Sequence, residues 1–221
     1  MLCIASNLQQ LGITNGDSVG KAGFITSVYI MLVPVVGLFF KKKTHPLIWL
    51  CAVVSAVGLY FLSVDPARGA FNIEFSDLAY LGCAVFFAVQ IILVSIYSPQ
   101  VNCIALSCIQ FAVAAVFSGI GMLFFETPSF AAILNAAGPL LYAGILSCGI
   151  AYTLQVIGQR GIDPAIASLI MCLESVFSVI AGFLLLNQRM TPREILGCGI
   201  MFAATVAAQL IPSTQKKNSR N

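Results

Sequence analysis

Long apolar runs of about 20 residues follow one another along this chain, and they restrict its fold more than any other feature. A helix of about that length crosses the roughly 30 Å hydrocarbon core of a bilayer. Inside a bilayer only helices or closed barrels pair every backbone polar group, and the runs lack the polar–apolar alternation of barrel strands. The sequence therefore predicts an all-α fold, that of a polytopic α-helical membrane protein.

The composition agrees with this prediction. Charged residues make up 9% of the 221 residues, whereas an ordinary soluble protein has about 25%. Hydrophobic residues make up 59%, and the mean hydropathy is +0.98. A soluble domain of this size could not cover its surface with so few polar side chains, so the lipid bilayer is the first partner that we expect.

Polar segments divide the apolar runs into successive spans. We expect membrane helices at residues 19–40, 46–64, 76–98, 102–125, 136–158, 163–186 and 192–212. Residues 1–12 are apolar but too short to cross, and they resemble the second half of a helix. A signal peptide is not expected there, because the segment has no positively charged start and no small-residue cleavage site.

The loops between these spans carry unequal numbers of basic residues. Short cytoplasmic loops are enriched in Lys and Arg, so the richer side should face the cytoplasm. That side carries Lys41, Lys42, Lys43, Arg160, Lys216, Lys217 and Arg220, and the other side carries Lys21, Arg68, Arg189 and Arg193. We therefore predict a multi-pass protein of the cell membrane with a cytoplasmic C-terminus.

The chain also repeats weakly at an offset of 146 residues. The segment LQQLGITNGD at 8–17 lies over LQVIGQRGID at 154–163, and Pro46 lies over Pro192 at the same offset. An odd number of predicted spans separates the two prolines, so the second half should lie inverted in the membrane. Inverted repeats with a binding site at their interface are typical of secondary transporters.

The repeat predicts the domain organisation. Residues 1–64 form the C-terminal part of a first repeat, 65–75 an inter-repeat loop, 76–212 a second, five-helix repeat, and 213–221 a polar cytoplasmic tail. At the same offset, the partner of residue 76 would lie about 70 residues before Met1. We therefore expect inverted five-helix repeats with the first repeat truncated. The alternative is that the segments present form the complete protein and that the repeat is coincidental.

Two blocks of the sequence resemble a known family. The block SVGKAGFITSVYIMLVPVVGLFF at 18–40 resembles the fourth helix of EamA-type transporters of the drug/metabolite transporter superfamily. The block PAIASLIMCLESVFSVIAGFLLLNQRMTPREILGCGIMFAATVAAQL at 164–210 resembles their ninth and tenth helices. Three departures stand out: Ser175 replaces the family's usual proline, Asn187 and Gln188 replace its usual Gly-Glu, and the first two and a half helices are absent.

The resemblance implies a fold and a function. The family has ten helices in two inverted halves, with both termini in the cytoplasm. The implied function is secondary transport, often export, of small metabolites, amino acids or drug-like compounds by alternating access. The alternative is a truncated membrane protein that does not transport, or an assembly partner. A small-molecule substrate is then the second expected partner, and a homo-oligomer is compatible with the sequence.

Glu174 is an acid near the middle of a predicted span. At 100° per residue it shares one helix face with Ala167, Met171, Ser178 and Gly182, whereas Ile166, Ile170, Leu173, Phe177, Ile180 and Leu184 form a bulky face suited to lipid. An ionised carboxylate at mid-bilayer costs at least about 2.5–3.5 kcal/mol. Glu174 is either a proton-coupling or substrate-contacting acid, or a protonated acid that hydrogen-bonds a neighbouring helix. At the repeat offset it lies over Val28, so the acid is not duplicated.

Several other polar side chains are candidates for substrate contact. Gln9 and Gln155 occupy equivalent repeat positions and could line one central cavity, and Gln90 and Gln110 are further intramembrane amides. Interhelical hydrogen bonding is the alternative for each amide. Lys21 either extends to the membrane surface or binds an anionic substrate group. Tyr152, like Tyr29 and Tyr97, either contacts substrate or packs in the core.

The sequence argues against several other kinds of site. The eight cysteines stand singly, without a Cys-x-x-Cys pair, and the single histidine, His45, lies in a loop. A metal site is therefore not expected, and we predict no cofactor. We also predict no catalytic residues and no nucleic-acid partner, so the chain is not expected to be an enzyme. A Gly-rich loop followed by Lys and Ser or Thr is absent, which argues against direct ATP use.

Overall fold

The structure is a computed structural model, and it describes residues 1–15, 19–41, 44–63, 75–125, 129–186 and 191–210. The predicted tail at 213–221, and all of the predicted inter-repeat loop except Phe75, lie outside these residues. So do Lys42, Lys43, Arg68, Asn187, Gln188, Arg189, Lys216, Lys217 and Arg220.

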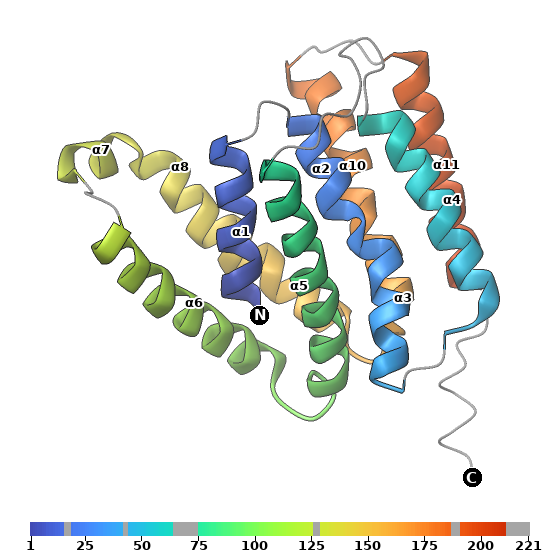
Figure 1. Cartoon of the computed structure of the whole chain (residues 1–221), viewed down its shortest axis with the longest axis horizontal. Coiled ribbons are helices and arrows are strands. Elements are labelled where there is room, and N and C mark those ends of the chain that lie inside the picture. Colours follow the sequence, from blue (N-terminus) through green and yellow to red (C-terminus); the bar gives the residue numbers. More distant parts are fainter. Residues whose placement is uncertain (16–18, 42–43, 64–74, 126–128, 187–190, 211–221) are drawn as a thin grey trace.

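The described elements are all helices (Figure 1). In chain order they are α1 (Leu2–Asn15), α2 (Val19–Ser27), α3 (Tyr29–Phe39), α4 (Pro46–Ser63), α5 (Phe75–Tyr97), α6 (Cys103–Phe125), α7 (Phe130–Asn135), α8 (Ala137–Leu141), the π-helix η2 (Tyr142–Tyr152), α9 (Thr153–Gly158), α10 (Pro164–Leu186) and α11 (Pro192–Leu210). The described part of the chain contains no strand. The predicted all-α class is therefore confirmed.

Five of the described helical stretches are long and apolar enough to cross a membrane. They are Phe75–Tyr97, Cys103–Phe124, Ala137–Gly158, Pro164–Ala181 and Pro192–Leu210. Two shorter apolar stretches, Gly23–Phe39 and Pro46–Leu62, lie where we predicted spans at 19–40 and 46–64. The predicted multi-pass membrane architecture is thus confirmed.

The predicted span at 19–40 is not one uninterrupted helix. It is divided at Val28 into α2 and α3. The Val28 N–H donates to the Ile25 carbonyl, three residues back, at 3.2 Å, and the Val28 carbonyl accepts from both Met31 and Leu32. Pro34 lies in the following helix and cannot donate a backbone hydrogen bond to Ile30.

Side-chain caps fix the starts of three long helices. The Asn102 Oδ1 atom accepts from the backbone N–H of Ile104 at 2.9 Å, before α6. Asp163 Oδ1 accepts from the N–H of Ala165 at 2.9 Å, before α10. At α11, the Thr191 N–H donates to Glu194 Oε2 at 2.6 Å, and the Glu194 N–H donates to Thr191 Oγ1 at 3.3 Å. This reciprocal pair is a capping box.

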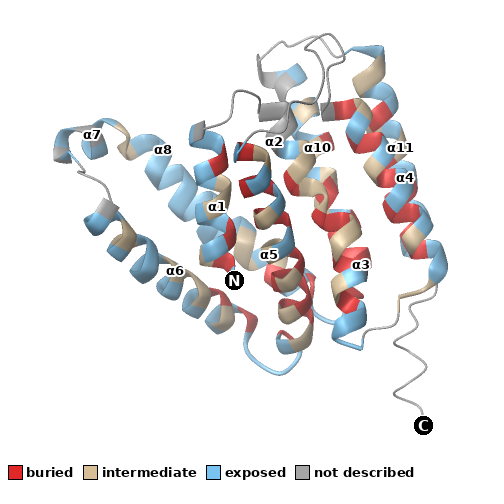
Figure 2. Cartoon of the chain, in the orientation of Figure 1, coloured by how far each residue is buried: buried red, intermediate tan, exposed pale blue. Residues whose placement is uncertain are grey.

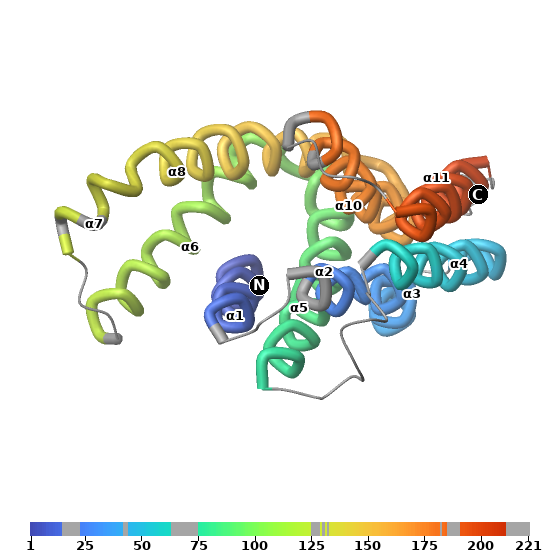
Figure 3. Tube along the Cα trace, turned by 90° about the horizontal axis from the view of Figure 1, so that it is seen from above, coloured from blue at the N-terminus to red at the C-terminus, as the bar shows by residue number. Residues whose placement is uncertain are grey.

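The helices form a packed bundle with a more exposed wing. Figure 2 shows buried residues concentrated on α3, α4, α5, α10 and α11, whereas α6, α8 and η2 are mostly exposed. Seen from above, α6 and the α8–η2–α9 run form the wing, and α4 lies beside α11 at the opposite end (Figure 3). The wing's apolar side chains are those that we expect to meet lipid or other helices.

The closest helix contact joins α4 and α11 at two glycines. A Cβ atom on Gly197 would lie 2.6 Å from the Gly58 carbonyl oxygen, so both positions exclude any side chain larger than hydrogen. Small residues that let two backbones approach are typical of helix pairs in membranes. The pair therefore anchors the two helices directly to each other.

Helices at equivalent repeat positions run in opposite directions. In Figure 1, α2 and α3 descend where α10 ascends, and α4 ascends where α11 descends. Adding the offset of 146 to the bounds of α4 gives 192–209, against Pro192–Leu210 for α11. The end of α3, the end of α9 and the end of α11 lie at the same end of the molecule. Lys41, which follows α3, and Arg160, which follows α9, are therefore at one end.

Candidate functional site

Glu174 lies near the middle of α10, on the side opposite its main packed face. Along this helix Ala165, Leu169, Cys172 and Val176 are buried, whereas Glu174 is exposed. The bulky residues Ile170, Phe177, Ile180 and Leu184 are exposed, as expected of a lipid-facing stripe, but Ile166 is buried and does not belong to it. Of the face predicted to be small and polar, Ser178 is exposed, Met171 is half-buried and Ala167 is buried.

Two tyrosines from other helices interact electrostatically with this carboxylate. Glu174 lies within range of electrostatic interaction with Tyr29 of α3 and Tyr152 of η2. Tyr29 is buried, and its side chain interacts with Cys172, which also interacts with Ser27. Tyr152 in turn lies near Cys83 of α5. Tyrosines of α3 and η2 are therefore near Glu174 of α10, and Cys83 of α5 is near one of them.

Aromatic rings extend this set toward α5 and α6. The Tyr152 ring meets the Phe111 ring edge-on, with centroids 5.8 Å apart. The Tyr29 and Phe87 rings are tilted, with centroids 6.5 Å apart. Both distances fall in the range of favourable aromatic pairs. The two tyrosines are thus held in place by phenylalanines of α6 and α5.

Gln90 and Gln110 meet between α5 and α6. The Gln90 Nε2 donates to the Gln110 Oε1 at 3.1 Å. Gln90 is 6% exposed, and its Oε1 has no hydrogen-bond partner among the residues that the structure describes. Both side chains line a cavity of about 210 Å³ whose other walls are mostly apolar. The predicted interhelical hydrogen bond is therefore present, and it leaves one amide acceptor unpaired.

The remaining sequence candidates lie elsewhere. Gln9 and Gln155 are half-buried on α1 and α9, and the structure does not pack these two helices extensively against each other. Lys21 is in α2, but its side chain lies outside the described residues. Tyr97 lines the same cavity as the two amides. The structure thus brings Glu174 near Tyr152, and Gln90 to Gln110, but it does not gather all the candidates into one group.

Sequence analysis did not single out Phe87, Phe111, Cys83 or Cys172. Each lies in an apolar run where phenylalanine and cysteine are ordinary packing residues. Their pairing depends on contacts between helices far apart in the chain, and no spacing in the sequence marks it. Within the described residues, no group of three or more His, Cys, Asp or Glu side chains is arranged to hold a metal ion.

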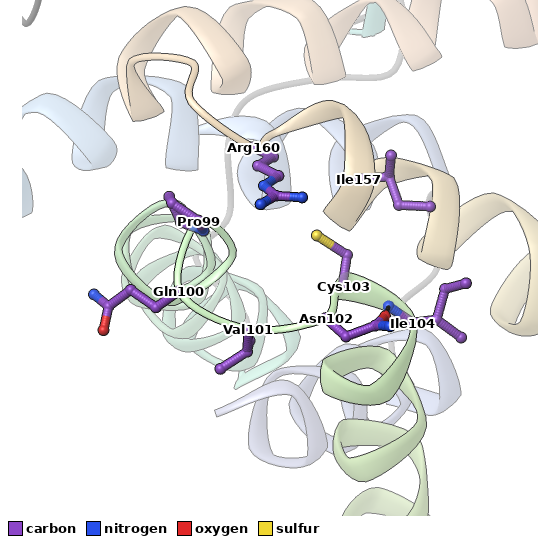
Figure 4. A pocket seen from close by; sticks show the side chains of 8 residues that line it. All are labelled: Pro99, Gln100, Val101, Asn102, Cys103, Ile104, Ile157 and Arg160. Atoms are coloured by element: carbon purple, nitrogen blue, oxygen red, sulfur yellow. Dashed lines mark hydrogen bonds between the residues drawn. The ribbon is translucent and has the colours of Figure 1, made fainter.

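A second cavity lies at the end of the molecule that carries Lys41. It has a volume of about 440 Å³ and is lined by residues 99–104, Ile157 and Arg160. The Arg160 side chain points into it across from Cys103 (Figure 4). The Cys103 thiol donates to the Ser98 carbonyl at 3.6 Å. This cavity lies at helix ends and contains none of the residues around Glu174.

Comparison with known proteins agrees with the fold. The model of the EamA-like transporter family matches residues 74–208. A protein of Archaeoglobus fulgidus described as an uncharacterized transporter is 30% identical over 192 residues, which are 86% of this chain and 60% of that protein. The chain thus spans less than two thirds of that relative's length.

A solved crystal structure shares the fold. It is 17% identical, with a TM-score of 0.78, and the alignment covers 98% of this chain and 75% of the solved one. The matched region of the family model contains Gln90, Gln110, Tyr152 and Glu174 together with helices α5 to α11. This chain belongs to the EamA-like transporter family.

Proposed function

We propose that this protein is a secondary transporter that exports small molecules, namely metabolites, amino acids or drug-like compounds, by alternating access. The observation that carries the proposal is the position of Glu174, in the middle of a membrane helix and near Tyr29 and Tyr152. A carboxylate at this depth is costly. Its cost is offset where the acid exchanges a proton or meets a substrate.

The placement of these residues supports alternating access. Tyr29 comes from the first predicted repeat, and Tyr152 and Glu174 come from the second. Transporters built from inverted repeats bind substrate between the two halves and expose it by moving one half against the other. The contact between Gly58 and Gly197 also joins the halves, and we propose that it stays closed while the wing of α6, η2 and α9 moves.

Glu174 is proposed to couple transport to protons. In the ionised state it would attract a proton or a cationic substrate group, and in the protonated state it would donate to an acceptor on the substrate or on a neighbouring helix. The groups within electrostatic range of it are the hydroxyls of Tyr29 and Tyr152 and the thiol of Cys172, which is buried on the other side of α10. Gln9, Gln90, Gln110, Gln155 and Lys21 are proposed as further substrate contacts.

The test is transport by the full natural protein in proteoliposomes under an imposed pH gradient. A panel of amino acids, amines and apolar drugs supplies the candidate substrates. We expect Glu174→Gln to abolish the pH dependence of export, because glutamine cannot release a proton. Glu174→Asp should retain the pH dependence, and Glu194→Gln, which keeps a capping side chain at the start of α11, is the matched control. An unchanged pH profile in Glu174→Gln would remove the coupling role.

A second function follows from the exposed wing. Large apolar side chains of α6 and η2, such as Phe117, Phe124 and Ile145, are exposed within the described structure. They favour a non-transporting membrane protein that assembles with other helices, or a homo-oligomer. Failure of the wild-type protein to move any compound of the panel would favour this alternative. Sequencing the DNA immediately upstream of Met1 for an in-frame segment encoding further apolar spans would discriminate the two independently.

The proposed location is the cell membrane with the C-terminus in the cytoplasm. Lys41 and Arg160 lie at the end of the molecule where α11 ends, and basic loops favour the cytoplasmic side. A cysteine-reactive label cannot report this cleanly, because the chain has eight native cysteines. Protease cleavage of a C-terminal epitope tag in right-side-out vesicles is the direct measurement. A tag that is cleaved from outside contradicts the orientation.

A further inference from the structure

The cavity beside Gln90 and Gln110 has mostly apolar walls and two polar amide groups. Its walls are formed by Leu2, Leu93, Val94 and Leu106, with Tyr97 and Met1 completing the lining. The two glutamines are the amide groups in this lining. Small-molecule sites typically have this composition, with mostly apolar walls and a few placed polar groups that orient the ligand.

The hydrogen bond between the two amides leaves unused hydrogen-bonding capacity. An amide carries two donors and an acceptor, and the bond between Gln90 Nε2 and Gln110 Oε1 uses one of each. Within the described part of the chain, Gln90 Oε1 is buried without a partner, which is uncommon for an interior polar atom. If the oxygen and nitrogen of both amides were exchanged, one acceptor and one set of donors would still be available to a ligand.

A carboxamide group on a ligand matches the available acceptor and donors. Its N–H can donate to one glutamine oxygen while its carbonyl accepts from the other glutamine's NH₂. Gln90 Oε1 is covered by neighbouring atoms. The terminal torsion of glutamine is soft, so a small rotation of the Gln90 amide turns this atom toward a ligand. An acid or an ammonium group would instead meet two neutral amides and lose most of its hydration, which disfavours it.

The two amides lie on the same helices as the rings that contact Tyr29 and Tyr152. Gln110 precedes Phe111, whose ring contacts Tyr152, and Gln90 lies three residues after Phe87, whose ring contacts Tyr29. Residues three apart lie on neighbouring parts of one helix face. Neither phenylalanine lines the cavity, so the amide pair and the two ring pairs are separate groups on the same two helices.

We propose that this cavity binds the carboxamide group of a small, largely apolar, uncharged molecule. That such molecules are also transported rests on the proposed function. That they bind in this cavity does not. It predicts discrimination between molecules of equal shape that differ only in the amide N–H groups. Sites built to hydrogen-bond an N–H reject analogues that lack it, because their own polar groups are then left unpaired.

The probes are benzamide and acetophenone, which have nearly the same shape, with NH₂ in the first where the second has CH₃. Binding of each is measured by equilibrium dialysis or saturation-transfer NMR with the full natural protein in nanodiscs. We expect benzamide to bind about tenfold more tightly than acetophenone. Gln90→Leu and Gln110→Leu should each remove this preference, while acetophenone binding is retained and shows that the cavity persists. Gln209→Leu, at an exposed position of α11, is the matched control.

The outcomes separate this inference from the proposed transport function. Equal affinities for the two probes, no binding of benzamide, or an unchanged preference in both leucine variants would overturn the amide site. None of these readouts requires transport. A protein that binds benzamide through the two glutamines but moves no compound across a membrane would leave this inference standing and contradict the transporter. If transport shows a pH dependence that requires Glu174 but the cavity shows no amide preference, the proposed function would stand and this inference would be contradicted.

Discussion

Replacing Gly197 by alanine tests whether the closest helix contact stabilises the fold. The added Cβ would lie 2.6 Å from the Gly58 carbonyl oxygen, 2.9 Å from the Leu62 nitrogen and 3.2 Å from the Phe61 Cβ. Two of these three neighbours are backbone atoms, which cannot rotate away as a flexible side chain can. Since ordinary contact begins near 3.4 Å, α4 and α11 must separate by several tenths of an ångström.

The cost of this separation can be bounded. A gap of about 0.5–1 Å forfeits about a quarter to a half of the dispersion energy of the atoms involved, and overpacking a closely packed site typically costs about 1–3 kcal/mol. Alanine also favours a helix over glycine by about 1 kcal/mol, which offsets part of the loss. The comparison with a second glycine of the same helix separates the two effects.

Gly199→Ala is that control, because its added Cβ would meet no atom within 4 Å. Both variants gain the same helix propensity, so their difference reports the steric clash alone. We expect Gly197→Ala to have a free energy of unfolding about 1–3 kcal/mol below that of Gly199→Ala. Trp49, the single tryptophan, lies in α4 and reports the loss of this helix pair by fluorescence during SDS-induced unfolding in mixed micelles. Equal stability of the two variants would refute the reasoning.

Three further predictions concern local contacts. Thr191→Val removes the hydroxyl of the α11 capping box and should lower the unfolding free energy by about 0.5–2 kcal/mol, whereas Thr191→Ser should preserve it in the same SDS titration. Arg193→Gln removes a guanidinium that lies 5.3 Å from the Tyr60 ring centroid and 5.4 Å from that of Phe61; we expect a loss of about 0.5–1 kcal/mol, and no difference from wild type would show that the stacking is energetically neutral. Tyr152→Phe keeps the ring contact with Phe111 but removes the hydroxyl near Glu174, so the pH profile of transport in proteoliposomes should shift while the unfolding midpoint stays unchanged; a changed midpoint with an unchanged profile would indicate a structural role only.

The positions of the membrane helices could be predicted from the sequence because they depend on local composition. A bilayer requires an apolar segment of fixed length whatever its neighbours are, so 76–98 and 192–212 closely match α5 and α11. The repeat could be predicted for a related reason. Turn-forming residues such as Pro46 and Pro192 mark helix starts directly, and both prolines are the first residues of their helices.

The pairing of side chains between helices could not be predicted in the same way. Hydropathy gives no direction to a helix that is apolar on all sides, so the burial of Ile166 and the ring contact between Phe111 and Tyr152 depend on tertiary packing alone. The π-helical geometry of η2 likewise has no signature in residues 142–152. The Gln90–Gln110 bond was one of two alternatives in the sequence, and only the structure shows that it forms.

Glu174 and the turn at Val28 lie at equivalent positions of the two repeats. At the repeat offset of 146 residues, Glu174 lies over Val28, and Ser175 lies over Tyr29. In the second half this level of the membrane carries an acid in an unbroken helix, α10, whereas in the first half it carries the break between α2 and α3, followed directly by a buried tyrosine.

At this equivalent position, one half therefore has an acid in its helix and the other half has the junction of two helices. Interrupted helices at membrane depth are tolerated where the backbone is buried in protein or lines a cavity, and an intramembrane acid has the same requirement. The electrostatic interaction between Tyr29 and Glu174 joins these two features across the pseudo-symmetry. A binding site at this level would accordingly be asymmetric, with Glu174 on one side and Tyr29 on the other.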